Sequence, residues 1–478
     1  MSSDFAVPEA TIASIQAGYR ARELSVVELV RAYLERIEAY DRGGPALNAI
    51  VATSEQALAH AEQLDREEPT GALHGIPVVL KDNINTSDLP TAYGSVAMRG
   101  YRPPEDATVA RRLRDAGAIV LAKTTLPDWA TSWFSYSSLT TETRNPYDPN
   151  RDPGGSSSGT GAAVAANLAT VGLGTDCGGS IRVPASFCNL VGVRSTPGVV
   201  PRTGTSYLVI PQDTVGPMAR TVEDARRVFG VIAGYDRADP YSVAATISRA
   251  PAQPPDNALN GARIGLVTNA IGEHPAIRDL IAAAARALET AGAQVEEVEL
   301  PDLFDHIVAT SMYTDRSKHD LDRFLAELPG APIPNLRTAY ENGQYDKRLD
   351  LMDAIMNGPE DPDRDPDYLA RFAARHEFTL VVENVMARFD ALAYPSVQVP
   401  PPTMEGRADW TTLTLPTNTL IASQTWLPAI TVPAGLTPEG APVGLELVGR
   451  PYDEATLFRL AHGFEHATHH RRAPESCP

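Results

Sequence analysis

The pattern of apolar and polar residues alternates between helical and strand periods along most of the chain. Ser25 and Glu28 have the spacing of a capping box, and apolar residues then recur on one helical face as far as Ile37. The continuous apolar runs IPVVL (76–80) and AIVLA (118–122) are typical of strands buried on both faces. The pattern also predicts strands at 48–53, 171–174, 263–267, 294–300, 391–394, 429–432 and 443–448, and helices at 54–64, 107–116, 158–168, 276–291 and from 454 onward. This alternation predicts an α/β fold in which helices cover a sheet.

One segment breaks the alternation. Residues 301–375 are helical but irregular, and they include the polar run PEDPDRDPD. Strand patterns return after this segment, so we interpret 301–375 as an insertion into a single domain that spans 1–478.

Composition limits the partners and the location that we expect. The 478 residues are 43% hydrophobic, and the net charge of −19 disfavours binding to nucleic acids and anionic membranes. The first residues lack the basic and apolar regions of a signal peptide, and no run approaches the roughly 18 apolar residues of a membrane span. The three cysteines have neither disulfide nor zinc-site spacing. We therefore expect a soluble cytoplasmic protein with no nucleic-acid partner, no membrane partner and no metal.

Three adjacent serines in PGGSSSGTGAAVAAN (153–167) form the first cluster of candidate reactive groups. Ser157 is the central residue of a G-x-S-x-G pattern, which in α/β-hydrolases presents a nucleophile directly after a strand. The preceding residues, NPYDPNRDP, are too rich in proline for a buried strand, which disfavours that interpretation. No lysine follows the glycines, so the segment is not a phosphate-binding Walker motif.

The stretch GTDCGGSIRVPA (174–185) has the composition of an oxyanion hole. Its glycine pair leaves the backbone unobstructed, so the N–H groups of Cys177, Gly178, Gly179 and Ser180 can converge on one oxygen. One such donor contributes about 3–4 kcal/mol in acyl transfer. A plain glycine turn would explain the same residues, and this alternative stays open here.

Lys81 follows the predicted buried strand in GIPVVLKDNIN, at a position where loop residues of α/β folds carry chemistry. The pKa of a lysine is ordinarily about 10.4. Burial with hydroxyl partners would lower this pKa and make the amine a base. The alternative is a structural lysine that pairs with Asp82.

Together and in this order, these segments resemble the amidase signature family of serine hydrolases. The matching motifs are GIPVVLKDN, PGGSSSG and GTDCGGSIRVPA, with support from DTVGPMARTVEDA and from LPAITVPAG and APVGLELVG near the C-terminus. The resemblance covers nearly the whole chain outside 301–375, and it implies a single domain with a mixed central sheet covered by helices on both faces. It also implies that Ser180 is the nucleophile, that Ser156 is a bridging serine in a cis conformation, and that Lys81 is the base.

This Ser–Ser–Lys triad implies a reaction without a cofactor or metal. Neutral Lys81 accepts a proton from Ser156, which accepts one from Ser180 as that oxygen attacks the carbonyl. Ser156 then protonates the leaving amine, and water, the second substrate, releases the acid. The chain departs from the commoner family pattern at Ser158, where glycine is common, and at Cys177, where threonine is usual. A nucleophilic Cys177 is the alternative to a Cys177 that contributes only its N–H.

Aromatic residues near these motifs are candidates for the substrate pocket. By the resemblance, Trp133 and Phe134 line the acyl pocket, and we expect Ser157 to contact the substrate; ordinary core aromatics are the alternative. The insertion is expected to cap this pocket through Tyr313, Phe324, Tyr340 and Met352.

Histidines cluster in the predicted C-terminal helix. His462 and His466 share one helical face, and His469 and His470 follow closely, which is a spacing that suits a metal. Histidine and arginine are also favoured at a helix C-terminus by the helix dipole, and we prefer this interpretation.

The expected function is hydrolysis of a carboxamide C–N bond in a small to medium amide, an amino-acid or peptide amide, or an aryl amide, with carbamates or esters as side substrates. The SSSG variant and QDTVGP (212–217) resemble the bacterial peptide-amidase branch of the family more than the amidotransferase branch. The alternatives are the A subunit of a tRNA-dependent amidotransferase that requires partner subunits, an esterase that uses Ser157, and an inactive binding module. We expect a monomer or a homodimer.

Overall fold

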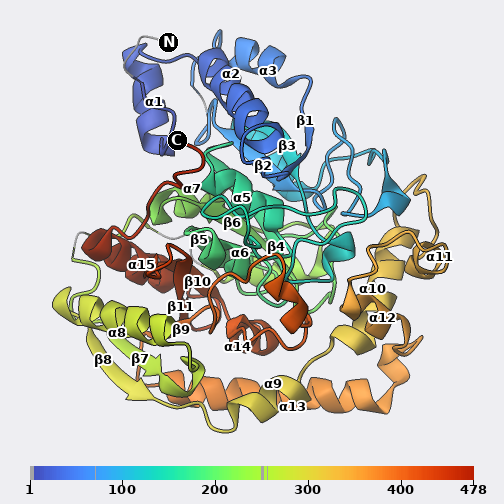
Figure 1. Ribbon diagram of the computed structural model, residues 1–478, viewed down its shortest axis with the longest axis vertical. Helices are drawn as coiled ribbons and strands as arrows, with labels where there is room; N and C mark the ends of the chain where they lie inside the picture. Colours follow the sequence, from blue (N-terminus) through green and yellow to red (C-terminus); the bar gives the residue numbers. More distant parts are fainter. Residues whose placement is uncertain (1–4, 70, 249–251, 256) are drawn as a thin grey trace.

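One sheet of 11 strands runs through the part of the chain that the computed structural model describes, which is residues 5–69, 71–248, 252–255 and 257–478 (Figure 1). In spatial order the strands are β1 (Ile50–Thr53), β3 (Ile119–Thr124), β2 (Pro77–Lys81), β4 (Val171–Asp176), β6 (Thr214–Ala219), β5 (Val191–Arg194), β10 (Ala429–Leu436), β11 (Pro442–Val448), β9 (Ala391–Pro395), β7 (Arg263–Val267) and β8 (Gln294–Val298). β2 pairs in parallel with β3 and β4, and β7 pairs in parallel with β8 and β9. The other neighbours are antiparallel, so the sheet is mixed.

Helices cover both faces of this sheet. α5 and α6 contact each other and pack on the central strands. In a second group of helices, α7 contacts both α4 and α15, and α15 also contacts α8. The bounds of these helices are α4 (Thr108–Asp115), α5 (Ser158–Ala165), α6 (Arg182–Phe187), α7 (Val222–Ile232), α8 (Pro275–Thr290) and α15 (Glu454–Thr468). α5 lies close to the sheet because its sequence, SGTGAAVA, contains only small side chains. A Cβ on Gly172 of β4 would come within 2.5 Å of Thr160 Cγ2 in α5.

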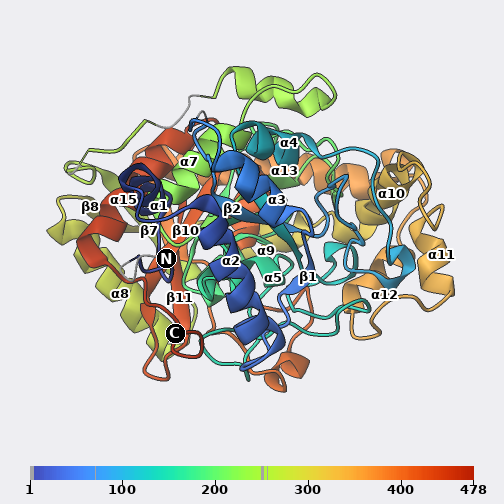
Figure 2. The ribbon, with the colours of Figure 1, turned by 90° about the horizontal axis from the view of Figure 1, so that it is seen from above.

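The N-terminal helices are α1 (Ile12–Ala21), α2 (Val26–Arg36) and α3 (Ala57–Leu64). α2 begins at the predicted capping box, in which Ser25 Oγ accepts from the Glu28 N–H and the Glu28 carboxylate accepts from the Ser25 N–H. Arg36 at the end of α2 donates to the carbonyl oxygens of Cys477 and Pro478. The C-terminal segment therefore lies against the end of α2 (Figures 1 and 2).

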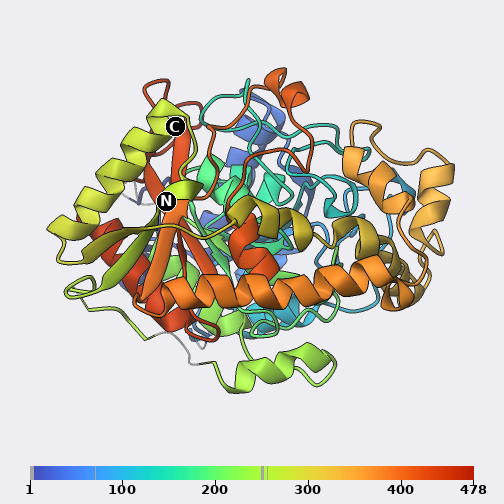
Figure 3. The same cartoon turned by 90° about the horizontal axis from the view of Figure 1, so that it is seen from below.

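The segment expected to be an insertion is helical. It contains α9 (Leu303–Ala309), α10 (Tyr313–Ala326), α11 (Leu336–Glu341), α12 (Asp350–Met356) and the first half of α13 (Pro366–Met386). α10, α11 and α12 lie together at one side of the molecule (Figure 1), and α13 extends across it in the view from below (Figure 3). The expected boundary at 375 falls inside α13. This helix continues because Phe378, Val382 and Met386, spaced by four residues, pack into a core with Val267 of β7.

Strands β5 and β6 were not among the predicted elements. Their sequences, VGVR and TVGPMA, are short and contain glycine or proline, which weakens a strand pattern. Helices α6, α7 and α14 (Thr419–Thr425) were also not predicted. Among the described residues, no helix is both long and apolar enough to cross a membrane.

Candidate active site

The parallel pairing of β2 with β4 brings the first two functional motifs together. Leu80 pairs with Leu173, so Lys81, the last residue of β2, lies beside the end of β4, where Thr175 and Asp176 follow. The serine loop reaches the same place because it leads into α5, which packs on β2 and β4. Carboxyl ends of neighbouring parallel strands are the usual location of sites in such folds.

Lys81 is fully buried, and its amine faces hydroxyl groups. Lys81 Nζ donates to Ser156 Oγ at 2.7 Å and to Thr175 Oγ1 at 2.8 Å. No carboxylate in the described ranges lies within ion-pair distance of this amine, and Asp82 pairs instead with Lys123, with Nζ and Oδ1 3.3 Å apart. The alternative in which Lys81 is the structural partner of Asp82 is therefore wrong.

The surroundings of Lys81 favour its neutral form. Burial lowers the pKa of Lys81 to about 7, although the negative charges of Asp213 and Asp176 act in the opposite direction. The two hydroxyl partners compensate for little of this burial because they carry no charge. The amine is thus able to accept a proton near neutral pH, as a general base must.

The two serine-bearing loops are joined through their backbones. The Ser157 N–H donates to the Ser180 carbonyl oxygen at 3.0 Å, and the peptide bond between Gly155 and Ser156 is cis. Ser156 is fully buried, whereas Ser180 keeps 6% of its surface exposed. Among the described residues Ser180 Oγ has no hydrogen-bond partner, so the expected contact between Ser156 and Ser180 is not formed in this structure.

The glycine loop that precedes Ser180 presents several free donors. Across the described residues, none of the N–H groups of Cys177, Gly178, Gly179 and Ser180 donates a hydrogen bond. Gly179 has a φ of +135°, which favours glycine, and a Cβ on Gly178 would lie 1.9 Å from the Tyr313 hydroxyl. Both glycines are therefore required by geometry, and the plain glycine turn does not account for the unused donors.

A buried charge cluster holds the end of this loop. Arg182 and Arg194 both donate to the Asp176 carboxylate, which also accepts from the Ile181 N–H at the start of α6. Burial alone would raise the pKa of Asp176, but the two guanidinium groups outweigh it and hold this pKa below its usual range. Asp176 is therefore a permanent anion that fixes the turn after β4.

Cys177 and Ser157 are poorly placed for nucleophilic attack. Burial, reinforced by Asp213, raises the pKa of the Cys177 thiol well above its ordinary value, so the thiolate is disfavoured. Ser157 is fully buried, its hydroxyl donates to the Thr175 carbonyl at 3.3 Å, and no strand directly precedes it. This geometry supports neither an esterase elbow at Ser157 nor the expected contact of its side chain with substrate.

The aromatic candidates divide into two groups. Trp133 and Tyr313 border the glycine loop, since a Cβ on Gly178 would approach both side chains within 3.2 Å. Phe134 does not border this loop, but it shares with Trp133 a buried cluster that also contains Val183, Phe187, Val397 and Leu415. The other three predicted cap residues pack, with Tyr313, in a core that joins segment 301–375 to residues 92–101 and 207–209: Phe324, Tyr340 and Met352.

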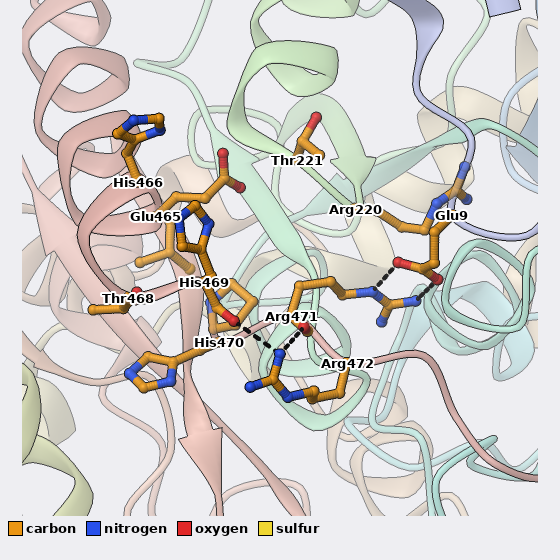
Figure 4. Close-up of a pocket in the computed structure, with 12 residues that line it drawn as sticks. Glu9, Arg220, Thr221, Glu465, His466, Thr468, His469, His470, Arg471 and Arg472 are labelled. Carbon is orange, nitrogen blue, oxygen red and sulfur yellow. Dashed lines mark hydrogen bonds and ion pairs between the residues drawn. The ribbon is translucent and has the colours of Figure 1, made fainter. Parts of the chain in front are cut away.

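The C-terminal histidines line a different pocket (Figure 4). This cavity of about 270 Å³ is bordered by His466, His469 and His470 and contains none of the triad candidates. Arg471 at its wall forms a two-point ion pair with Glu9, at 2.8 and 3.0 Å. In the ranges that the structure describes, no three His, Cys, Asp or Glu side chains are arranged to hold a metal ion.

Sequence reasoning missed three residues that contact the site. Thr175 binds the Lys81 amine, Gln212 Nε2 donates to the Cys177 carbonyl at 2.7 Å, and Thr419 Oγ1 donates to the Gly178 carbonyl at 2.6 Å. Thr175 and Gln212 lie within motifs quoted for the resemblance, but Thr419 lies in no motif. No local sequence signal identifies it.

Comparison with known proteins identifies the family. The Amidase family model matches residues 28–458. The native peptide amidase from Stenotrophomonas maltophilia superposes with a TM-score of 0.87 at 35% identity, covering 99% of this chain and 100% of that one. The A subunit of glutamyl-tRNA(Gln) amidotransferase from Thermotoga maritima gives a TM-score of 0.80 at 26% identity, with 99% of each chain covered. The curated A subunit of the same amidotransferase from Methanosarcina acetivorans is 33% identical over 472 residues, which are 95% of this chain and 97% of the relative. The protein therefore belongs to the amidase family, whose enzymes act on carbon–nitrogen amide bonds.

Proposed function

We propose that this chain hydrolyses a carboxamide through an acyl-enzyme on Ser180. The observation that carries the proposal is the buried Lys81, whose amine contacts two hydroxyls and has a pKa lowered to about 7. A structural lysine is normally paired with a carboxylate, as Lys123 is in the neighbouring strand. An unpaired buried amine next to a serine is instead suited to moving protons.

The proposed reaction uses the hydrogen bond between Lys81 and Ser156 and requires Ser180 to come within hydrogen-bond reach of Ser156. Lys81 accepts the proton of Ser156, and Ser156 accepts the proton of Ser180 as Ser180 Oγ attacks the carbonyl carbon. The free N–H groups of the glycine loop stabilise the negative oxygen of the tetrahedral intermediate. Ser156 then protonates the departing nitrogen, the C–N bond breaks, and water repeats the sequence to release the acid and restore Ser180.

The walls of the site suit an acyl group with apolar character. Trp133 and Tyr313 lie against Gly178, so an acyl chain bound to Ser180 would meet two aromatic side chains. Tyr313 is the first residue of α10, and through it the 301–375 insertion caps the site. Similarity in structure to a peptide amidase supports amino-acid or peptide amides as the substrate class.

A second candidate is the A subunit of an amidotransferase. Curated relatives favour it, because proteins that are 33 or 34% identical to this chain are named as the A subunit of glutamyl-tRNA(Gln) amidotransferase. In that case partner subunits and tRNA take part, and the expectation of no nucleic-acid partner applies only to the first candidate. The higher identity and TM-score with the peptide amidase than with the Thermotoga protein support the first candidate.

Release of ammonia from amides by the purified chain separates the two candidates. Peptide amides and amino-acid amides, including glutamine, would be incubated with the chain alone, with Ser180→Ala as the control. Turnover of peptide amides that is lost in Ser180→Ala supports the hydrolase. Turnover that appears only when an amidotransferase's other subunits and glutamyl-tRNA are added supports the second candidate and contradicts the first.

A further inference from the structure

The glycine loop is held through its carbonyl oxygens. The carbonyl oxygens of the four consecutive residues 176–179 each accept a hydrogen bond from a residue outside this stretch, at 2.6 to 2.7 Å. The donor–acceptor pairs are Arg194 Nη1 to Asp176 O, Gln212 Nε2 to Cys177 O, Thr419 Oγ1 to Gly178 O, and the Val183 N–H to Gly179 O. In a planar trans peptide the carbonyl of one residue and the N–H of the next point in opposite directions. Fixing each carbonyl therefore fixes the direction of the N–H that follows it.

Two of these four donors have other structural duties. Arg194 also binds the Asp176 carboxylate and the Gln212 carbonyl, and the Val183 N–H belongs to the first turn of α6. Gln212 and Thr419 are different, because they are neutral side chains that reach the loop from other segments. Gln212 lies 35 residues and Thr419 lies 241 residues from its partner in sequence.

Their neighbours hold both side chains in these positions. The Gln212 amide also lies 3.3 Å from the Tyr313 hydroxyl, and its backbone carbonyl accepts from Arg194 at 2.7 Å. Thr419 begins α14, and its hydroxyl lies 2.7 Å from Thr417 Oγ1. Thr417 Oγ1 in turn lies 3.2 Å from the Ser396 carbonyl oxygen.

We infer that Gln212 and Thr419 are positioning residues for the oxyanion hole. Gln212 aims the Gly178 N–H, and Thr419 aims the Gly179 N–H, toward the oxygen that becomes negative when Ser180 attacks. The inference rests on the proposed acyl-enzyme at Ser180. Both residues are buried and bind carbonyl oxygens of the loop, so the effect assigned to them here acts through the backbone donors that they orient.

The test is the second-order rate at which a fluorophosphonate labels Ser180 in the full chain. Thr419→Val keeps the shape of the side chain and removes its hydroxyl, and Gln212→Met removes the amide donor. Each variant is expected to label about 10- to 100-fold more slowly, below the effect of deleting a donor outright. The final amount of label per protein is expected to be unchanged, because each site still reacts once.

Three controls separate positioning from folding. Thr419→Ser restores a hydroxyl and is expected to label within about threefold of the wild type, as a retained hydrogen bond requires. Thr425→Val removes a hydroxyl from the same helix that bonds only within α14, and its labelling rate is expected to match the wild type. With an amide substrate that the wild type hydrolyses, Thr419→Val is expected to lower kcat and leave KM unchanged.

The outcomes that overturn the inference are distinct from those that overturn the function. Wild-type labelling rates in Thr419→Val and Gln212→Met would contradict the inference and leave Ser180 as the nucleophile. Slow labelling shared by Thr425→Val, or a reduced final amount of label, would show damage to the fold instead and would also contradict it. Absence of label on Ser180 in the wild type would overturn the proposed function and the inference with it.

Discussion

Lys81 and Lys123 lie in neighbouring strands and are both fully buried, yet their amines have different partners. Lys123 Nζ lies 3.3 Å from the Asp82 carboxylate and donates to the Ile84 carbonyl and to Thr91 Oγ1, each at 2.7 Å. Lys81 has two hydroxyl partners and no paired carboxylate in the described ranges. The same residue type therefore serves as a structural cation in β3 and as a titratable amine at the end of β2.

Burial alone therefore does not identify a catalytic lysine. Burial lowers the pKa of both amines, but at Lys123 the charge and hydrogen bond of Asp82 oppose that effect directly. Burial also disfavours the charged form of Asp82. It raises the pKa of Asp82 to about 6, while Lys123 acts in the opposite direction. The kind of partner, a carboxylate or a hydroxyl, decides which lysine holds its proton.

The largest expected effect comes from removing the Lys81 amine. Lys81→Met keeps a similar shape, and the rate of fluorophosphonate labelling at Ser180 should fall about 10³-fold, as expected for the loss of a general base. The folded state should persist, because the variant removes a buried polar group that has no ionic partner. Labelling kinetics and thermal unfolding measure the two effects. A labelling rate near that of the wild type would remove Lys81 from the mechanism.

The same substitution at the other lysine should give the opposite result. Lys123→Met leaves the Asp82 carboxylate buried without its cation, which should cost about 3–5 kcal/mol of unfolding free energy. The labelling rate per folded molecule should change far less than in Lys81→Met. Denaturant unfolding, together with labelling under conditions where the variant is folded, tests this contrast. Equal losses of labelling in both variants would contradict the distinction between the two lysines.

The pH dependence of labelling should follow Lys81. The amine must be neutral to accept a proton, so the rate should rise with pH and level off above its pKa of about 7. Below that value the rate should fall about tenfold for each pH unit, because the neutral fraction falls by that factor. The labelling rates of the wild type and of Lys81→Met would be measured over the same pH range. A wild-type rate that stays constant between pH 5 and 9 would contradict the assignment of Lys81 as the base.

Thr175 should have the smallest effect of this set. Its hydroxyl accepts from Lys81 Nζ at 2.8 Å, and a hydrogen bond of this kind stabilises the charged amine more than the neutral one. Thr175→Val should therefore move the midpoint of the labelling profile to lower pH, by about half to one unit. A midpoint that moves upward would mean that this hydroxyl disfavours the ammonium form.

The sheet was largely predictable where strands have continuous apolar runs. The strand at Arg263–Val267 has the predicted bounds, and the buried run at 76–80 corresponds to β2 within one residue. β6 was not predictable in this way, because Gly216 and Pro217 stand in the middle of a central strand. Pro217 pairs only with Leu173 of β4, because the ladder between β6 and β5 covers Met218 and Ala219 alone, and the local pattern does not reveal this register.

The candidate site was predictable only as far as its motifs extend. Lys81, Ser156 and the glycine loop stand in recognisable segments, and the structure brings these segments together. Thr419 is different because it meets Gly178 across 241 residues, through a helix that the sequence pattern did not predict. Contacts of this kind depend on how the sheet is assembled, so residue types and spacing alone do not reveal them.

The most direct test of this mechanism is to label the wild-type chain with a fluorophosphonate and to map the modified residue by mass spectrometry. We expect a single modification on Ser180 that is nearly absent from Lys81→Met over the same time. A label on Ser157 or Cys177, or equal labelling of both proteins, would contradict a nucleophile at Ser180 that is activated through Lys81.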